Sequence, residues 1–157
     1  MPVTLRPVGP DDQDFLYKVY ASTRRAEMAA WGWNEAQQDA FLRMQFIAQS
    51  RSYEAHSTSA THSIILLDGE PAGRLLVSRS EDEIQLTDIS LLPEHRGHGI
   101  GTGLIKDLLD EAERDGRTVC LEVLRHNPAA RLYARLGFVV TGEHDLYLQM
   151  RRHPTTA

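Results

Sequence analysis

The pattern of apolar and polar positions changes repeatedly between two periods along the chain. Segments with apolar residues at every second position, or in short continuous runs, predict strands. The strand-like segments are Val3–Val8, two runs within 62–80, Glu83–Leu92, Thr118–Leu124, Phe138–Gly142 and Asp145–Met150. Asp68-Gly69 divides the two runs within 62–80 and suits the positive backbone angles of a tight hairpin turn. A meander of strands is therefore expected in the middle of the chain.

Helical spacing of apolar residues occurs between these strands. An acidic first turn after Gly9-Pro10 opens a helix through about Arg25, and Asn34 is a candidate N-cap for a second helix. The second helix should present one apolar face, formed by Ala40, Phe41, Met44, Ile47 and Ala48. A third helix runs from Ile100 to Asp115-Gly116, and a short fourth occupies Asn127–Gly137. The order of elements predicts a mixed α/β fold of the α+β type.

Composition limits the number of domains and the class of partner. A chain of 157 residues with 41% hydrophobic residues can bury one substantial core, so a single domain over 1–157 is expected. The formal net charge of -5 disfavours binding driven by overall charge to nucleic acid or to an anionic membrane. The N-terminus lacks an apolar signal core, and no run of about 18 apolar residues occurs. The expected location is cytoplasmic.

Cysteine and histidine usage argues against two further kinds of site. Cys120 is the only cysteine, which excludes an internal disulfide framework and a cysteine-rich zinc site. It lies in an apolar strand and is expected to be a small buried hydrophobic residue. The seven histidines form no convincing ligand set, so no metal is expected.

The segment LLPEHRGHGIGTGL carries the most specific chemistry. Glycine occupies every second position from Gly97 to Gly103, between a predicted strand and a predicted helix. Such a loop can turn backbone amides toward one point at the positive end of a helix, which favours a phosphate. A P-loop is excluded because no lysine follows a glycine, and a dinucleotide fingerprint fails because Thr102 replaces its last glycine. A glycine-rich turn that binds nothing is the alternative.

Two motifs in the same order resemble a known family. The first is R-x-x-G-x-G, formed by Arg96, Gly99 and Gly101, and the second is LEVLRHNPAARLYARLGF over Leu121–Phe138. Together they resemble the GNAT superfamily of acetyl-coenzyme A dependent N-acetyltransferases. The resemblance implies a GNAT-like fold, with a mixed, mostly antiparallel twisted sheet flanked by helices and a splayed central strand pair.

The resemblance also implies which residues bind acetyl-coenzyme A, the expected co-substrate. The strand before the loop should contact the pantetheine arm, and the loop should surround the pyrophosphate mainly through its backbone amides. Asn127 should contact the coenzyme arm as well, although it could instead cap the helix that begins at Pro128. The expected contacts are Ile89, Ser90, Leu91, Arg96, Gly97, His98, Gly99, Gly101, Thr102 and Asn127.

Acetyl transfer to an amine needs a stabilised oxyanion, a proton for the departing thiolate and a neutral nucleophile. The resemblance places the general acid at Tyr133, for which core packing is the alternative, and the backbone amide of Leu91 suits the oxyanion. Glu122 is the first candidate for the base, followed by Glu27 and then Asp88. Trp31 and Trp33 line an acceptor pocket in one interpretation, and they pack in the core or between helices in the other.

The expected function is transfer of acetyl from acetyl-coenzyme A directly to a primary amine. The amine is a small molecule, an amino acid or a protein N-terminus, and the sequence does not choose among them. No nucleic acid or membrane partner is expected, and a homodimer is left open. Two alternatives remain, namely a non-catalytic coenzyme A binding sensor or partner module, and a nucleotide-binding protein.

Overall fold

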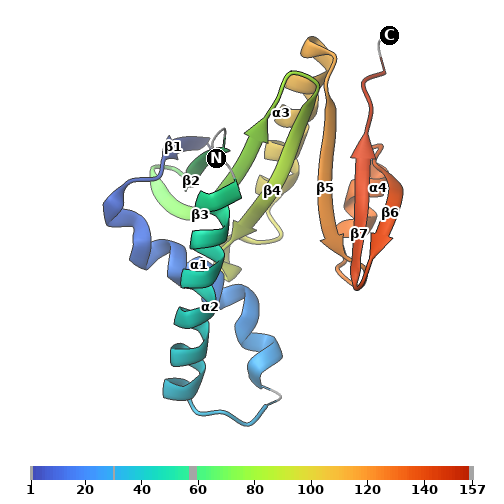
Figure 1. Ribbon diagram of the computed structural model, residues 1–157. Helices are drawn as coiled ribbons and strands as arrows, with labels where there is room; N and C mark the ends of the chain where they lie inside the picture. Colours follow the sequence, from blue (N-terminus) through green and yellow to red (C-terminus); the bar gives the residue numbers. More distant parts are fainter. Residues whose placement is uncertain (1, 30, 57–59, 156–157) are drawn as a thin grey trace. The chain divides into compact units, whose positions relative to one another are not determined.

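The structure is a computed structural model that describes residues 2–29, 31–56 and 60–155, with side chains at 26, 27, 29 and 52–56 left out. Figure 1 shows the elements in chain order. They are β1 (Val3–Pro7), η1 (Pro10–Asp12), α1 (Gln13–Ala29), α2 (Glu35–His56), β2 (Ala60–Leu67), β3 (Glu70–Arg79), β4 (Glu83–Leu91), η2 (Pro93–His95), α3 (Ile100–Asp115), β5 (Thr118–Leu124), α4 (Ala129–Arg135), β6 (Val139–His144) and β7 (Tyr147–Arg152).

The strands form a seven-stranded sheet in the order β1-β2-β3-β4-β5-β7-β6. The pairs β1–β2, β5–β7 and β6–β7 are antiparallel, whereas β4 and β5 are parallel. The register of the parallel pair runs from Glu83–Thr118 to Leu86–Leu121, and both strands continue beyond it. The predicted mixed, mostly antiparallel sheet with helices is confirmed.

The chain divides into two compact units, residues 1–76 with 88–100 and residues 77–87 with 101–157. The expectation that they act as one domain stays a prediction. Within the described ranges, no helix has both the length and the apolar composition needed to span a lipid bilayer.

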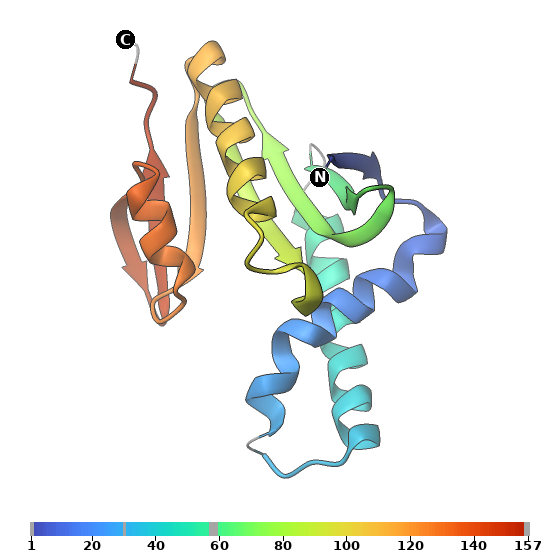
Figure 2. The same cartoon turned by 180° about the vertical axis from the view of Figure 1, so that it is seen from behind.

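The first unit has its core between the helices α1 and α2 and strand β2. Figure 2 shows α1 and α2 as a helical hairpin. Tyr17 and Tyr20 of α1 both place their rings against Phe46 of α2, with centroid distances of 5.8 and 5.7 Å. Leu16, Ala21, Met28, Leu42 and Ile64 complete this buried cluster. Aromatic and aliphatic packing of this kind supplies most of the free energy that fixes such a hairpin.

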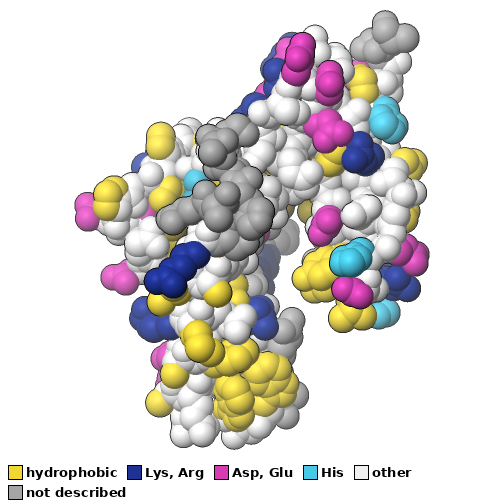
Figure 3. Space-filling model, viewed as in Figure 1, with side chains coloured by type: hydrophobic (Ala, Val, Ile, Leu, Met, Phe, Trp, Pro, Cys, Tyr) yellow, Lys and Arg dark blue, Asp and Glu magenta, His cyan; other side chains and the backbone are white. Residues whose placement is uncertain are grey.

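The apolar face predicted for α2 is not its buried face. Leu42 and Phe46, one turn apart, are buried against α1, whereas Met44 is 61% exposed and Ile47 is 51% exposed. Periodicity identifies apolar positions but not the side that meets a neighbour, and Tyr17 and Tyr20 pack on the Leu42 side. Figure 3 shows hydrophobic side chains gathered at the connection between α1 and α2.

The second unit is built around α3 and β5. The helical pattern predicted after the glycine loop is confirmed, because its apolar positions from Leu104 to Ala112 are buried. Val119, Cys120, Leu121 and Val123 of β5 are also buried. Gly116 ends the helix with a positive φ of 67°.

Candidate functional site

The glycine loop joins η2 to α3 in a conformation that two of its glycines make accessible. Gly97 and Gly99 have φ angles of 78° and 79°, a region that L side chains rarely adopt. A Cβ added at either position would meet no atom within 4 Å. The loop backbone is therefore open to an approaching group, and its glycines are required by conformation rather than by packing.

The backbone amides of this loop lack acceptors within the described part of the chain. No hydrogen bond joins the N–H groups of Gly97, His98 or Gly99 to another described residue. The first amides of α3, from Ile100 to Thr102, are also unpaired by helix geometry and lie at its positive end. An anion is the ligand that such an arrangement favours.

Arg96 fixes the entrance of the loop. Its Nε donates to the carbonyl oxygen of Leu91 at 3.0 Å, and a terminal nitrogen donates to the Ser22 hydroxyl of α1 at 3.3 Å. A guanidinium has five N–H donors, so these bonds leave capacity for an anion. The predicted contact of Arg96 with pyrophosphate stays a prediction, and its positioning of Leu91 is a second role that the sequence did not indicate.

The end of β4 lies unusually close to β3 at Gly73. A Cβ on Gly73 would overlap the carbonyl oxygen of Ser90, and it would lie 2.9 Å from Cδ2 of Leu91. The Leu92 amide donates to the Ala72 carbonyl at 2.9 Å beside this contact. Gly73 therefore shapes the segment expected to bind the pantetheine arm, and sequence analysis missed it, although an isolated glycine in a strand is a signal of close backbone approach.

Asp88 is poorly suited to act as the base. Its Oδ2 accepts from Nε of Arg74 at 2.9 Å and from a terminal nitrogen at 2.6 Å, while its Oδ1 accepts the Ser90 hydroxyl at 2.7 Å. These three bonds fill most of the roughly four lone-pair sites of a carboxylate, so little of its capacity is left for the proton of an incoming amine. This geometry argues against the third candidate.

A cleft of about 450 Å³ lies beside the segment that leads into the loop. The helix α1 forms one wall and the chain just after β4 forms the other. The cleft contains two cations and one carboxylate, from Lys18, Arg25 and Glu94, beside neutral side chains. Its lining residues are Tyr17, Lys18, Ala21, Ser22, Arg25, Leu92, Pro93 and Glu94. Glu27 belongs to α1, but its side chain lies outside the described residues.

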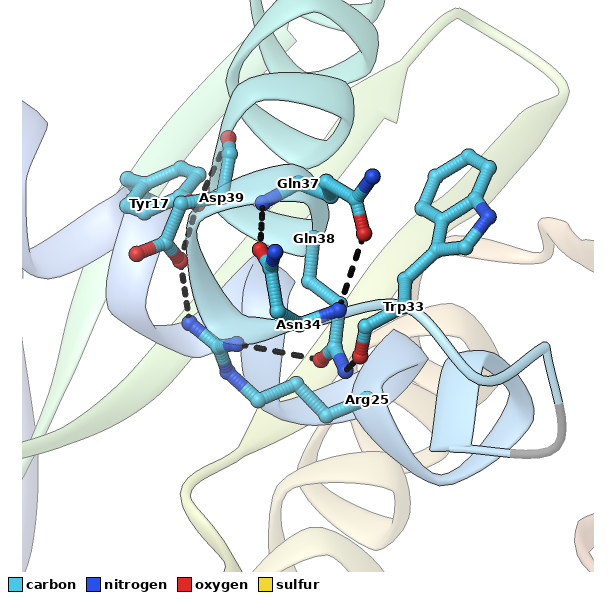
Figure 4. A network of polar contacts seen from close by, with 7 residues as sticks. All are labelled: Tyr17, Arg25, Trp33, Asn34, Gln37, Gln38 and Asp39. Atoms are coloured by element: carbon cyan, nitrogen blue, oxygen red, sulfur yellow. Dashed lines mark hydrogen bonds and ion pairs between the residues drawn. The ribbon is translucent and has the colours of Figure 1, made fainter.

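The connection between α1 and α2 is fixed by a polar network (Figure 4). Asn34 caps α2 as predicted, because the Gln37 amide donates to Oδ1 of Asn34 at 2.8 Å and Oε1 of Gln37 accepts the Asn34 amide at 3.0 Å. The Gln38 side chain donates to the Trp33 carbonyl at 3.0 Å. Arg25 adds an ion pair with Asp39 at 2.6 Å.

The tryptophans of this connection lie at the surface. Trp31 and Trp33 are 48% and 37% exposed, and both rings pack edge to face against Phe41. Neither tryptophan belongs to the buried cluster around Tyr17, Tyr20 and Phe46, but the predicted alternative of packing against a helix agrees with their contacts with Phe41 of α2. Their role as an acceptor surface stays a prediction.

Tyr133 and Asn127 lie around α4 in the second unit. Tyr133 is 8% exposed, and its ring lies 5.6 Å from that of Phe138, edge to face. The side-chain oxygen of Asn127 accepts the Ala129 amide at 2.9 Å. Asn127 therefore does cap the first turn of α4, and only its amide nitrogen is left to donate to a coenzyme.

Glu122 is an exposed residue near the end of β5. It pairs with Gln149 of β7 in the antiparallel register, and it lines a small pocket of about 110 Å³. Cys120, two residues earlier, is buried, and burial raises the pKa of its thiol. The thiol is therefore a poor nucleophile.

The predicted residues fall into two groups. Ile89–Leu91 and Arg96–Gly99 lie in the first unit, whereas Glu122, Asn127 and Tyr133 lie in the second. Gly101 and Thr102 continue the loop directly into the second unit. Within the described ranges, no group of three or more His, Cys, Asp or Glu side chains is arranged to hold a metal ion.

Proteins of known sequence or structure resemble the chain, and three of them illustrate the range. Streptothricin acetyltransferase of Streptomyces lavendulae is 38% identical over 109 residues, covering 59% of this chain and 58% of that protein. The [ribosomal protein bS18]-alanine N-acetyltransferase of Escherichia coli (strain K12) is 36% identical over 77 residues, covering 48% and 49%. The crystal structure of PaiA N-acetyltransferase from Thermoplasma acidophilum in complex with coenzyme A covers 98% of this chain and 99% of its own, with a TM-score of 0.71 and 17% identity.

The structural match establishes the fold, while the sequence matches span 58% and 49% of the relatives' own lengths. Residues 16–138 match the model of the Acetyltransferase (GNAT) family, a range that includes the glycine loop and Tyr133. The chain belongs to the acetyltransferase (GNAT) family.

Proposed function

We propose that this chain is an N-acetyltransferase, that it moves acetyl from acetyl-coenzyme A to a primary amine, and that residues 1–157 act as one domain. The observation that carries the proposal is the open glycine loop at the start of α3. Its amides lack acceptors within the described residues, and Gly97 and Gly99 expose the backbone. Family membership and the coenzyme A complex of the PaiA protein support the same ligand.

The charge around the loop supports the pyrophosphate of coenzyme A as its ligand. Amide donors and the positive end of α3 favour a dianionic group, and Arg96 brings a permanent cation to the same segment. His98 and Thr102 would contact the pyrophosphate through their backbones. Ile89, Ser90 and Leu91 would contact the pantetheine arm along β4, and the amide nitrogen of Asn127 would add one donor.

Three groups of this chain would share the chemistry. The Leu91 amide would donate to the thioester oxygen as negative charge develops there. Tyr133 would donate its phenolic proton to the sulfur as the carbon–sulfur bond breaks. A carboxylate would accept the proton that the amine loses as the new carbon–nitrogen bond forms.

Glu122 is the carboxylate that we propose as the base. It is exposed on β5, and no ion pair among the described residues occupies it. Glu27, in the N-terminal helical region, is the second candidate. Asp88 is bound by Arg74 and Ser90 and ranks last.

The acceptor is proposed as a primary amine without a narrower class. One relative is named for streptothricin and another for an alanine of ribosomal protein bS18. The two names therefore indicate different acceptors. A homodimer and a cytoplasmic location stay predictions.

An amine screen tests the proposed function. Purified protein and acetyl-coenzyme A are mixed with amino acids, small diamines, streptothricin and peptides that begin with alanine, and free thiol release is followed. At least one amine should accelerate release over the amine-free rate, with an N-acetyl product seen by mass spectrometry. Tight coenzyme A binding without transfer to any amine would support the non-catalytic module instead.

A further inference from the structure

A buried arginine in the middle of β3 has no part in the function proposed above. The strand is buried from Ala72 to Val77, and Arg74 is the charged residue of that run, with only 2% of its surface exposed. Removing a guanidinium from water costs free energy that a buried ion pair often fails to return. Stability alone is therefore a weak reason for an arginine at this position.

Arg74 connects three elements of the first unit. Its Nε and a terminal nitrogen donate to Oδ2 of Asp88 in β4 at 2.9 and 2.6 Å. A terminal nitrogen also donates to Oε1 of Gln49 in α2 at 3.3 Å. The Ser90 hydroxyl donates to the other oxygen of Asp88 at 2.7 Å. The result is a continuous set of polar contacts from α2 through β3 to the end of β4.

The contacts meet β4 at the segment that the coenzyme is expected to use. Asp88 and Ser90 are two residues apart and so point to the same face of the strand, on either side of Ile89. The missing side chain of Gly73 lets the Ser90 carbonyl approach β3, and the Leu92 amide is bonded to Ala72. Side-chain bonds therefore hold Asp88 and Ser90, backbone contacts hold Ser90 to Leu92, and both sets act on the same end of β4.

We propose that Arg74, Asp88 and Ser90 are positioning residues that fix the backbone of Ile89–Leu91 for the acetylated pantetheine arm. The inference rests on the proposed function, since it assigns these residues to the binding of that coenzyme. A backbone donor stabilises developing charge only when it is held in place before the reaction. Small displacements of a reacting group lower rates steeply, so a restraint next to Leu91 acts on both binding and turnover.

If Arg74 had a purely structural role, its substitution would affect stability but not coenzyme binding. A second arginine–carboxylate pair provides the control. Arg79 at the end of β3 donates to Glu111 of α3 through two bonds of 2.7 and 3.0 Å. This pair also joins an arginine of β3 to a carboxylate, and it belongs to the second unit, whereas β4 residues 88–91 belong to the first. If Arg74 served stability alone, Arg74→Met and Arg79→Met would differ only in how strongly they destabilise the fold.

The experiment compares Ser90→Ala, Asp88→Asn, Arg74→Met and the control Arg79→Met. Calorimetry gives the Kd of acetyl-coenzyme A for each, thermal unfolding gives Tm, and kinetics with an amine from the screen give kcat and both KM values. We expect the first three variants to weaken acetyl-coenzyme A binding about tenfold or more and to lower kcat, with the amine KM unchanged. Arg79→Met should bind acetyl-coenzyme A like the wild type.

The outcomes distinguish failure of the proposed function from failure of the positioning role. Failure of the wild type to bind acetyl-coenzyme A would overturn the proposed function itself. Wild-type binding together with unchanged Kd and kcat in Ser90→Ala and Asp88→Asn would overturn only the positioning role. Ser90→Ala removes one hydroxyl, so it keeps the inference testable even if Arg74→Met does not fold.

Discussion

The glycines of the loop and the glycine of β3 occupy opposite surroundings. A Cβ at Gly97 or Gly99 would meet nothing within 4 Å, whereas a Cβ at Gly73 would overlap the backbone of Ser90. The loop glycines leave space for something outside the chain, and Gly73 leaves space for the chain itself. We therefore expect glycine to serve binding in one region and packing in the other, and substitutions should separate the two.

The largest effect is expected at Gly73. Gly73→Ala places a methyl group against the Ser90 carbonyl, so β3 and β4 must move apart, and we expect a loss of about 3 kcal/mol in the free energy of unfolding. Urea denaturation measures this free energy of unfolding. Gly103→Ala is the control, because Gly103 is exposed within α3 and the change should stabilise by about 0.5–1 kcal/mol. Equal stability of Gly73→Ala and the wild type would contradict the claim that close packing of β3 and β4 requires Gly73.

A substitution at Tyr133 tests whether a residue near the proposed site acts in turnover rather than in coenzyme binding. Tyr133→Phe keeps the ring and its contact with Phe138 but removes the phenolic proton. We expect turnover to fall by about 10²-fold while the Kd of acetyl-coenzyme A stays the same, because general acid catalysis acts in the transition state. Steady-state kinetics and calorimetry check the two quantities. Unchanged turnover would leave Tyr133 as a packing residue.

Glu122 is expected to have a smaller effect that depends on pH. An exposed base on β5 accepts a proton only when it is ionised, so Glu122→Gln should flatten the acidic limb of the rate profile. Glu143→Gln is the matched control, because Glu143 is an exposed residue of β6 paired with Arg125. A wild-type pH profile in Glu122→Gln would contradict its role as the base and leave Glu27 as the next candidate.

The smallest effect is expected at His62, in the region of Gly73. Burial lowers the pKa of this imidazole, as does Arg74, while Asp88 and Asp12 act in the opposite direction. The unfolded chain therefore binds the proton more readily, and stability should fall as pH drops below about 6.5. The fall should be shallower in His62→Gln, which urea denaturation at several pH values measures. An identical slope in both proteins would contradict the lowered pKa.

The two regions also differ in how well the sequence predicted them. The loop was predicted because Arg96, Gly99 and Gly101 form a local motif, and α3 was predicted because its apolar residues follow the helical period. Gly73 and Arg74 depend on residues of β4 that are distant in sequence, so no local pattern defines their partners. For the same reason periodicity did not identify Leu42 and Phe46 as the buried side of α2.

Site roles were less predictable than site positions. The motif that ends in Leu-Gly-Phe located Tyr133 on a short helix, as the structure has it. The same motif did not distinguish a coenzyme contact from a helix cap at Asn127, because an amide side chain serves both. Asp88 was a reasonable base by residue type alone, and its engagement by Arg74 depends on the tertiary structure.

The central claim is that the loop binds coenzyme A through its backbone, and calorimetric titration of coenzyme A into a pair of variants tests it most directly. Gly101 and Gly103 both lie in the first turn of α3, but residues two apart point to opposite sides of a helix. Gly101→Val should weaken coenzyme A binding at least about tenfold, because its side chain enters the space of the pyrophosphate, while Gly103→Val binds like the wild type. Folded Gly101→Val protein that binds coenzyme A as tightly as the wild type would contradict the account.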